Sequence, residues 1–175
     1  MSRDDLEIIA GHTRFGFMKV ASGRPVVKSG EACTQLYFLI NGSIRVITYS
    51  DDYGYSVEEQ ISAPYILQVE GFFGYHQRYT HDFIASPDVN FITIDKEEQV
   101  RLSEDFLVFR LNLMNNFATQ TQKQLRQSWL HQPQSLRERV ERFLTQHCVY
   151  PAGHKQFNIL MTRLADEMND SRLNV

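Results

Sequence analysis

Residues 36–49 read LYFLINGSIRVITY, and this stretch decides the fold class. An apolar run of strand length, Leu36–Ile40, is followed at once by Asn41-Gly42, and a second run then continues from Ser43 to Tyr49. Aromatic and β-branched residues favour strands, and Asn-Gly is the strongest short hairpin signal because both turn positions need a positive φ. The stretch therefore predicts two strands joined by a tight hairpin.

The same pattern extends on both sides, over roughly residues 15–95. Short aromatic and β-branched runs alternate with turns at Ser22-Gly23-Arg24-Pro25, Asp51-Asp52-Tyr53-Gly54 and Ser86-Pro87-Asp88. Many short strands with frequent turns are typical of a β-sandwich, jelly roll or barrel.

A different pattern follows Leu102. Ser103 is a candidate helix cap with Glu104 and Asp105 behind it, and no Gly or Pro occurs again until Pro133. This predicts a helix of up to about 29 residues, on the order of 40 Å long. One small β domain cannot cover such a helix, so a second copy of the chain is the simplest partner. The alternative is a break near Asn115-Asn116, after which the helix folds back on its own domain. The predicted contact residues have a 3–4 spacing: Phe106, Phe109, Leu113 and Phe117.

A third segment begins after Pro133. Residues 135–144 form an amphipathic helix pattern, and residues 157–159 form a short strand pattern. Thr162 is the expected cap of a helix from Arg163 to Met168. After a turn at Asn169-Asp170, Ser171 is the expected cap of a further helix that starts at Arg172.

Composition excludes several classes of protein. The chain has 175 residues, is 42% hydrophobic and 22% charged, and carries a net charge of −3. Residues 1–102 hold 9 Lys and Arg against 14 Asp and Glu, so the acidic excess lies in the front part. No apolar run reaches the roughly 18 residues of a membrane span, and the N-terminus lacks a secretory signal. We therefore expect no membrane partner and a cytoplasmic location, in which Cys33 and Cys148 stay reduced.

Catalytic and metal-binding patterns are missing from the sequence. There is no G-x-S-x-G elbow, P-loop or H-E-x-x-H motif. His76 and His81, with Asp82 adjacent, are interpreted as surface residues, because side chains next to each other on a strand face opposite ways. We expect no enzyme activity, no catalytic residues, no metal and no cofactor.

The order of these motifs resembles that of one family. The hairpin sequence at 36–46 preceded by Gly30-Glu31, the run Gly71-Phe72-Phe73-Gly74, the helix start at 135–139 and the pattern of 162–175 resemble the cyclic-AMP receptor protein/fumarate–nitrate regulator (Crp/Fnr) superfamily of transcription regulators. The likeness covers roughly residues 15–175. It implies an α+β protein with three parts: an N-terminal double-stranded β-helix (jelly-roll) domain like those that bind cyclic nucleotides at 1–102, a long dimerisation helix at 103–132, and a truncated winged helix-turn-helix at 133–175.

The resemblance also implies a homodimer that binds double-stranded DNA. Carried over by position, Arg172 contacts a base, Asn174 is a weaker candidate, and Thr162 and Ser171 are caps that also meet phosphate. The sequence ends four residues into the recognition helix, too few to form a stable helix. We therefore expect this chain to bind DNA poorly and the natural protein to continue beyond Val175.

The resemblance places an effector pocket at the run that starts with Gly71. Its candidate residues are Gly71, Phe73, Gly74, Tyr75, Arg78, Tyr79 and Thr80. Members that bind cyclic nucleotides have a glutamate after the second glycine and, some ten residues later, an arginine beside Ser or Thr. Here Tyr75 and Tyr79 stand at these positions, and the loop is too short for the helix that holds the phosphate. We expect an unknown small-molecule effector and no binding of cyclic AMP or cyclic GMP. The alternatives are a free-standing ligand-binding β-roll without DNA binding and a cupin-like enzyme.

Overall fold

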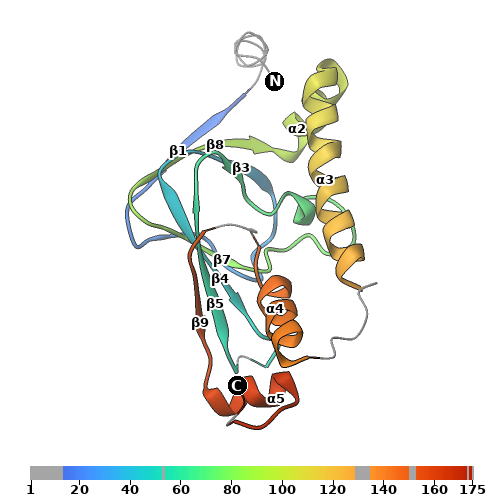
Figure 1. The fold of residues 1–175 in the computed structure, drawn as a ribbon. Coiled ribbons are helices and arrows are strands. Elements are labelled where there is room, and N and C mark those ends of the chain that lie inside the picture. Colours follow the sequence, from blue (N-terminus) through green and yellow to red (C-terminus); the bar gives the residue numbers. More distant parts are fainter. Residues whose placement is uncertain (1–13, 53, 129–134, 150–152, 173, 175) are drawn as a thin grey trace.

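The computed structural model describes residues 14–52, 54–128, 135–149, 153–172 and 174, with no account of the side chains of 123, 124 and 126–128. The strands form two antiparallel sheets (Figure 1). One sheet has the order β1 (Gly16–Val20), β8 (Val89–Asp95), β3 (Gln35–Asn41) and β6 (Tyr65–Ile66). The other has the order β2 (Pro25–Val27), β7 (Asp82–Ala85), β4 (Ser43–Tyr49), β5 (Ser56–Ser62) and β9 (Lys155–Asn158).

The core of this β-roll is built from the apolar faces of both sheets. In β8, Val89, Phe91 and Thr93 alternate with half-buried residues, as the period of two requires, whereas β3 buries Leu36 on one face and Leu39 on the other. The large, fully buried side chains of this core include Leu36, Leu39, Ile44, Leu67, Phe72, Phe83 and Phe91.

The Asn41-Gly42 turn joins the two sheets. β3 pairs with β6 and β8, whereas β4 pairs with β5 and β7, so the hairpin predicted between β3 and β4 is wrong. Gly42 has φ +89°, and a Cβ there would lie 2.7 Å from the carbonyl oxygen of Asp88. The glycine is needed because the chain turns a corner against the β7–β8 connection. The paired hairpin is instead β4–β5, which turns through residues 50–55.

The predicted start of the long helix at Ser103 is also wrong. Ser103 lies in α2 (Lys96–Asp105), where its hydroxyl donates to the carbonyl of Gln99 at 2.9 Å. Phe106 then has extended backbone, with φ −123° and ψ 102°, and the long helix α3 (Leu107–Ser128) begins after it. α3 has 22 residues and is about 33 Å long. It continues through Asn115-Asn116, so the alternative of a break at that point is wrong.

The inner face of α3 covers the β-roll (Figure 1). Phe109 and Leu113 are buried in the main core, and Phe106 and Phe117 pack against it half-buried. The sequence predicts these four side chains at a dimer contact, but the structure packs them on the chain's own core. The 3–4 spacing identified a buried face correctly and assigned it to the wrong neighbour.

After residue 134 the described parts of the chain form α4 (Leu136–Gln146), β9 and α5 (Met161–Met168). Ser135 caps α4 in a capping box with Glu138: each side chain bonds the other residue's backbone N–H. These elements share a small second core, and Tyr55 of the β-roll belongs to it. Its buried members are Tyr55, Phe143 and Met168, with Leu136, Val140, Phe157, Ile159 and Leu164 half-buried around them.

Figure 1 shows β9 lying along β5, so the C-terminal segment adds a strand to the sheet of the β-roll. The predicted strand at 157–159 therefore forms two residues earlier, as Lys155–Asn158. Among the helices that the structure describes, none is both long and apolar enough to cross a bilayer.

Candidate effector pocket and its link to the C-terminal segment

The loop between the short 3-10 helix η1 (Val69–Gly71) and β7 is the predicted effector site. Residues 72–81 are all described and contain no helix, in agreement with the predicted loss of the phosphate-binding helix. Part of the loop instead pairs with residues 30–33. Gly30 N donates to the carbonyl of Tyr79 at 2.8 Å, Tyr79 N to that of Glu31 at 2.9 Å, and Cys33 N to that of Gln77 at 3.0 Å.

Gln68 fixes the end of this loop. It is buried and has a left-handed backbone, with φ 32°. Its carboxamide oxygen accepts from Thr80 N at 2.8 Å, and its nitrogen donates to the carbonyl of Arg78 at 2.9 Å. The backbone N–H groups of Tyr79 and Thr80 are thus both used within the protein, and a cyclic phosphate would find neither of them open.

The predicted pocket residues separate into two groups. Gly71, Arg78 and Thr80 line a cavity. Gly71 is buried, and a Cβ there would lie 2.7 Å from the Gln68 amide nitrogen, so close packing accounts for the glycine. Arg78 lies at the loop edge, where its Nη1 donates to the carbonyl of Gly30 at 2.6 Å.

The other predicted pocket residues do not line this cavity. Tyr79 is buried in the core, and its hydroxyl donates to the carbonyl of Gln35 at 3.2 Å. Tyr75, at the position of the family's glutamate, is 95% exposed. Phe73 and Gly74 are also on the surface, and the Phe73 ring meets Phe72 edge-to-face and lies under the ammonium group of Lys96. Three of the seven predicted residues therefore line a cavity, while the aromatic ones lie in the core or on the surface, and the effector site itself stays a prediction.

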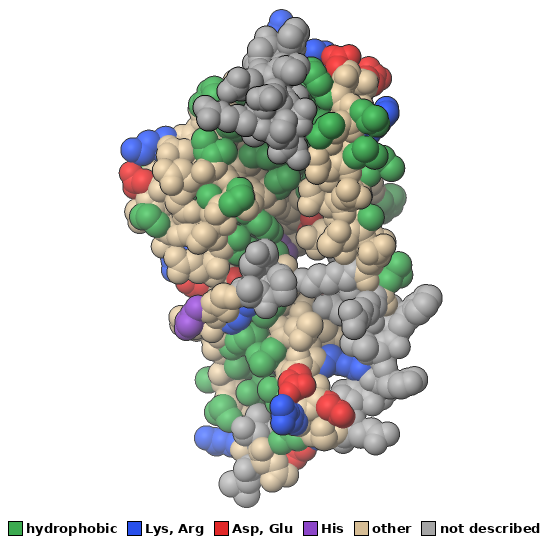
Figure 2. Space-filling view, turned by 45° about the horizontal axis from the view of Figure 1, so that its top comes forward, with side chains coloured by type: hydrophobic (Ala, Val, Ile, Leu, Met, Phe, Trp, Pro, Cys, Tyr) green, Lys and Arg blue, Asp and Glu red, His purple; other side chains and the backbone are tan. Residues whose placement is uncertain are grey.

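The cavity has a volume of about 360 Å³ and brings together three parts of the chain. Figure 2 shows the molecule hollowed between the sheets and α3. Gln120 comes from α3, while Gln146, His147, Cys148 and Val149 come from the end of α4. Sequence spacing could not reveal these residues, because they lie far apart in the chain. The β-roll contributes Thr48, Gln68, Glu70, Gly71, His76, Arg78, Thr80 and His81.

His81 is the most perturbed ionisable group of this cavity. Its Nδ1 lies 3.0 Å from the hydroxyl of Thr48, and burial lowers the pKa of His81 to about 4, against the opposing charges of Glu59 and Asp82. The surface interpretation is right for His76, which is exposed, and wrong for His81, which is half-buried. Within the described residues, no group of three or more His, Cys, Asp or Glu side chains lies close enough to hold a metal ion.

The predicted DNA-contacting residues lie in and after α5. Thr162 is in the first turn of α5 rather than its cap, which is Leu160. Ser171 and Asn174 belong to a turn: Asn174 N donates to the carbonyl of Ser171 at 3.0 Å, and its side chain donates to Asp170 at 2.8 Å. Arg172 is exposed in the same turn.

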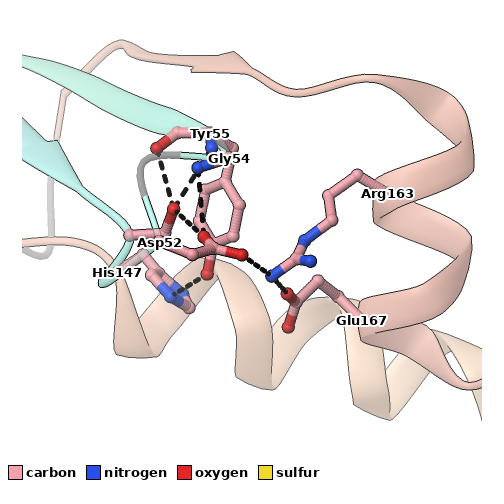
Figure 3. A network of polar contacts seen from close by, with 7 residues as sticks. Asp52, Gly54, Tyr55, His147, Arg163 and Glu167 are labelled. Carbon is pink, nitrogen blue, oxygen red and sulfur yellow. Dashed lines mark hydrogen bonds and ion pairs between the residues drawn. The ribbon is translucent and has the colours of Figure 1, made fainter.

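A polar network joins the β4–β5 hairpin to α4 and α5 (Figure 3). The hydroxyl of Tyr55 lies 2.7 Å from Nε2 of His147, whose Nδ1 lies 2.7 Å from the carbonyl of Phe143. Arg163 pairs with Asp52 at 2.9 Å and with Glu167 at 2.8 Å. The Gly54 N–H and the Ser50 hydroxyl bond the carboxylate and lower the pKa of Asp52. The tip of the β4–β5 hairpin is thus tied directly to the segment that holds the predicted DNA-contacting residues.

Glu59 makes a second connection between the β-roll and this segment. Its carboxylate is fully buried, accepts from Val149 N and pairs with Lys155 of β9. A buried carboxylate needs such partners, because removing a charge from water is costly.

Comparison with solved structures gives the same architecture. The catabolite activator protein of Thermus thermophilus is 15% identical, with a TM-score of 0.65 over 99% of this chain and 79% of that one. The sensor domain of the transcriptional regulator DNR from Pseudomonas aeruginosa is 14% identical, with a TM-score of 0.56 over 77% and 87%. The chain has a Crp/Fnr-like cyclic-nucleotide-binding fold.

A further structure of this fold is the c-di-GMP responsive global regulator CLP of Xanthomonas campestris, which is 18% identical, with a TM-score of 0.54 over 99% of this chain and 87% of that one. No family model and no curated protein matches the sequence. The Crp/Fnr-like fold therefore rests on the structure, and the pocket and DNA-facing residues have to be argued from their own chemistry.

Proposed function

We propose that this chain is the sensor and dimerisation part of a DNA-binding transcription regulator, which responds to a small molecule other than a cyclic nucleotide. The activity is genetic rather than catalytic. Support comes from the Crp/Fnr-like fold, from a cavity shared by the β-roll, α3 and the end of α4, and from the outer face of α3.

The outer face of α3 is the observation that carries the proposal. Exposed residues recur at alternating steps of four and three, the spacing of a coiled-coil seam. Figure 2 shows hydrophobic side chains gathered along the side of the molecule where α3 lies. We call this set the α3 stripe: Leu107, Leu111, Met114, Ala118, Thr121 and Leu125. It lies on a different face from Phe109 and Leu113, so a second copy can pack on it without disturbing the core.

Sedimentation velocity tests the α3 stripe. Leu111→Glu places a charge in the middle of the seam. We expect it to raise the dissociation constant of the dimer about 100-fold or more, because the charge is buried without a partner. Asn112→Glu, next to Leu111 in the sequence but turned away from the seam, is the control and stays dimeric. The proposed interface is contradicted if the wild-type protein sediments as a monomer even at high protein concentration. It is also contradicted if Leu111→Glu stays as dimeric as the wild type.

DNA binding is tested by gel shift of the full-length protein with the DNA upstream of its own gene. Arg172→Ala is expected to weaken a specific complex about 10- to 100-fold, the usual loss of one bidentate base contact. Arg137→Ala, an exposed arginine of α4 paired with Glu141, is the matched control. No specific shift with the wild-type protein, or equal effects of both changes, contradicts the DNA-binding part.

A free-standing sensor is the second candidate, because β9 is part of the β-roll sheet. It requires the same cavity and the same ligand response, with no DNA complex in the gel shift. A cupin-like enzyme has no comparable support, since the described residues hold no metal-binding cluster.

The absence of cyclic-nucleotide binding has its own test. Tyr75 points into solvent, and the Tyr79 and Thr80 N–H groups already have partners, so neither ribose nor phosphate has its usual contacts. Isothermal titration with millimolar cyclic AMP and cyclic GMP should give no heat of binding. A dissociation constant in the micromolar range for either nucleotide contradicts this proposal.

A further inference from the structure

A second cavity lies beside the first one. It has a volume of about 670 Å³ and lies between strands β3 and β6 and helix α3. Its walls are mostly apolar: Phe38, Ile40, Tyr65 and Ile66 come from the strands, and Phe109 and Leu113 from the helix. We call it the apolar cavity, and the 360 Å³ cavity next to the loop 72–81 the polar cavity.

The two cavities are neighbours. Glu70, Gln120 and Val149 line both of them. One end of the combined space is lined by hydrogen-bonding side chains, such as Arg78, Thr80 and His81, and the other end by aromatic and aliphatic groups. A molecule that fills both ends has to be amphipathic.

The polar cavity has no strong excess of charge. Arg78 contributes a positive charge, and Glu70 at the junction contributes a negative one. Burial lowers the pKa of His81 to about 4, which keeps its ring neutral near pH 7. The Arg78 guanidinium is already bonded to the Gly30 carbonyl. An anion would therefore meet a cation that already has a partner, while an uncharged amide or alcohol can exchange hydrogen bonds with the Thr80 and Gln120 side chains.

We propose that the two neighbouring cavities together bind a small amphiphile with an uncharged hydrogen-bonding head, of the amide or alcohol type, and an apolar chain. The head lies in the polar cavity beside Arg78 and Thr80, and the chain lies between β3, β6 and α3. This proposal rests on the proposed sensor function and names the class of effector.

Such a ligand contacts every part of the chain that the regulator has to coordinate. The apolar tail of the ligand lies against Phe109 and Leu113 of α3, and the opposite face of this helix carries the α3 stripe. The head lies against His147, which bonds Tyr55 in the network of Figure 3. Binding can therefore bias both the dimer helix and the docking of α4 and α5.

The probe for binding is 1-aminoanthracene, an uncharged amphiphile whose fluorescence rises in apolar surroundings, with competition by decanamide. We expect saturable binding of one molecule per chain and displacement by decanamide at a dissociation constant on the order of 10 μM. Hexanamide, four methylenes shorter, should be weaker by about 200-fold if all four methylenes are buried, because each buried methylene contributes a factor of about four. Decanoate should be weaker than decanamide by about 10-fold, because its head is charged.

Two variants locate the site. Asn116→Trp fills the apolar cavity from an exposed position on α3 and should weaken decanamide about 10-fold or more. Asn115→Trp, next to it and lining neither cavity, is the control and should bind as wild type. Thermal melts of both variants check that the fold is kept. Unsaturable fluorescence, equal binding by Asn116→Trp and Asn115→Trp, or decanoate binding as tightly as decanamide overturns the proposal.

The decanamide experiment and the gel shift test the ligand class and the regulator function separately. Decanamide binding without a DNA complex supports the ligand class and contradicts the regulator. A DNA complex without decanamide binding supports the regulator and overturns the ligand class.

Discussion

Gly42 stands where the chain leaves one sheet and enters the other. It combines a positive φ of +89° with a close approach to Asp88 and Val89. Gly23 has a similar φ of +77°, with open space where its Cβ would be. The pair therefore separates backbone strain from crowding.

We expect Gly23→Ala to lower the free energy of unfolding by about 1 kcal/mol, the strain of a left-handed alanine. Gly42→Ala should cost about 3 kcal/mol, because the new methyl group also displaces the β7–β8 connection. Urea denaturation of both variants measures the difference. Equal losses in the two variants would show that the β7–β8 connection moves to make room for the new methyl group at no cost in free energy.

His81 is the residue whose ionisation should make stability depend on pH. Its folded pKa is about 4, well below the value of about 6.5 in an unfolded chain, so the unfolded state takes up a proton first as the pH falls. The contribution of the neutral His81 ring to the free energy of unfolding is fully present above about pH 6.5 and is lost as the pH falls towards 4. Between pH 7.5 and 5 this loss amounts to about 2 kcal/mol. His81→Gln should remove this part of the loss, measured by urea denaturation at the two pH values. The same slope in the variant would mean that other groups are responsible.

At the scale of the element, the start of α4 is determined by local sequence. Ser135 and Glu138 form a reciprocal capping box, and the predicted amphipathic pattern from residue 135 agrees with the helix that forms. The start of α3 shows the opposite case. Ser103 has the sequence of a cap, but residues 96–105 form α2 because Leu102 is drawn into the core. Tertiary burial overrides a local signal worth only about 1 kcal/mol.

Ser135→Ala should therefore cost about 1 kcal/mol of stability, and Glu138→Ala somewhat less. The double variant should lose less than the sum of the two, because both side chains serve the same box. Hydrogen exchange of the α4 amides, read together with urea denaturation, assigns the loss to this helix. Strict additivity would show that the two side chains act separately.

At the scale of the whole molecule, the β-roll and the C-terminal segment share one sheet. Glu59 of β5 is fully buried under this contact, with Lys155 and the Val149 N–H as partners.

Lys155→Ala leaves the carboxylate without its counter-ion, and we expect the free energy of unfolding to fall by about 3 kcal/mol. Faster exchange of the β9 amides, with β3 and β8 unchanged, locates the loss. Glu59→Gln with Lys155→Met should recover most of it, since no charge is then left buried. Failure of this double change would show that the pair stabilises through more than charge.

The sequence predicts the elements of this fold better than their neighbours. The strands, the long helix and the amphipathic helix can all be recognised from period and propensity, and the ordered motifs indicate the Crp/Fnr-like architecture. Pairing is less accessible: Asn41-Gly42 has the local chemistry of a hairpin, and long-range β7 and β8 contacts decide otherwise. Gln120 continues the 3–4 spacing of Leu113 and Phe117, but no spacing places it near Gln146, because separate elements bring the two together at the cavity. The division at 102 and 132 remains a prediction, as do the roles of Thr162 and Arg172.

The contact of β9 with β5 also has a consequence for biosynthesis. Ser56 and Asn158 are 102 residues apart, so β5 is made long before the strand that covers it. At about 5–20 residues per second, its hydrogen-bonding edge stays open on the ribosome for roughly 5–20 seconds. The β5 sequence carries Glu58 and Glu59, and charges of this kind discourage open edges from pairing with other nascent chains. The carboxylate that later makes the buried pair with Lys155 thus has an earlier use, in keeping the unfinished protein from aggregating.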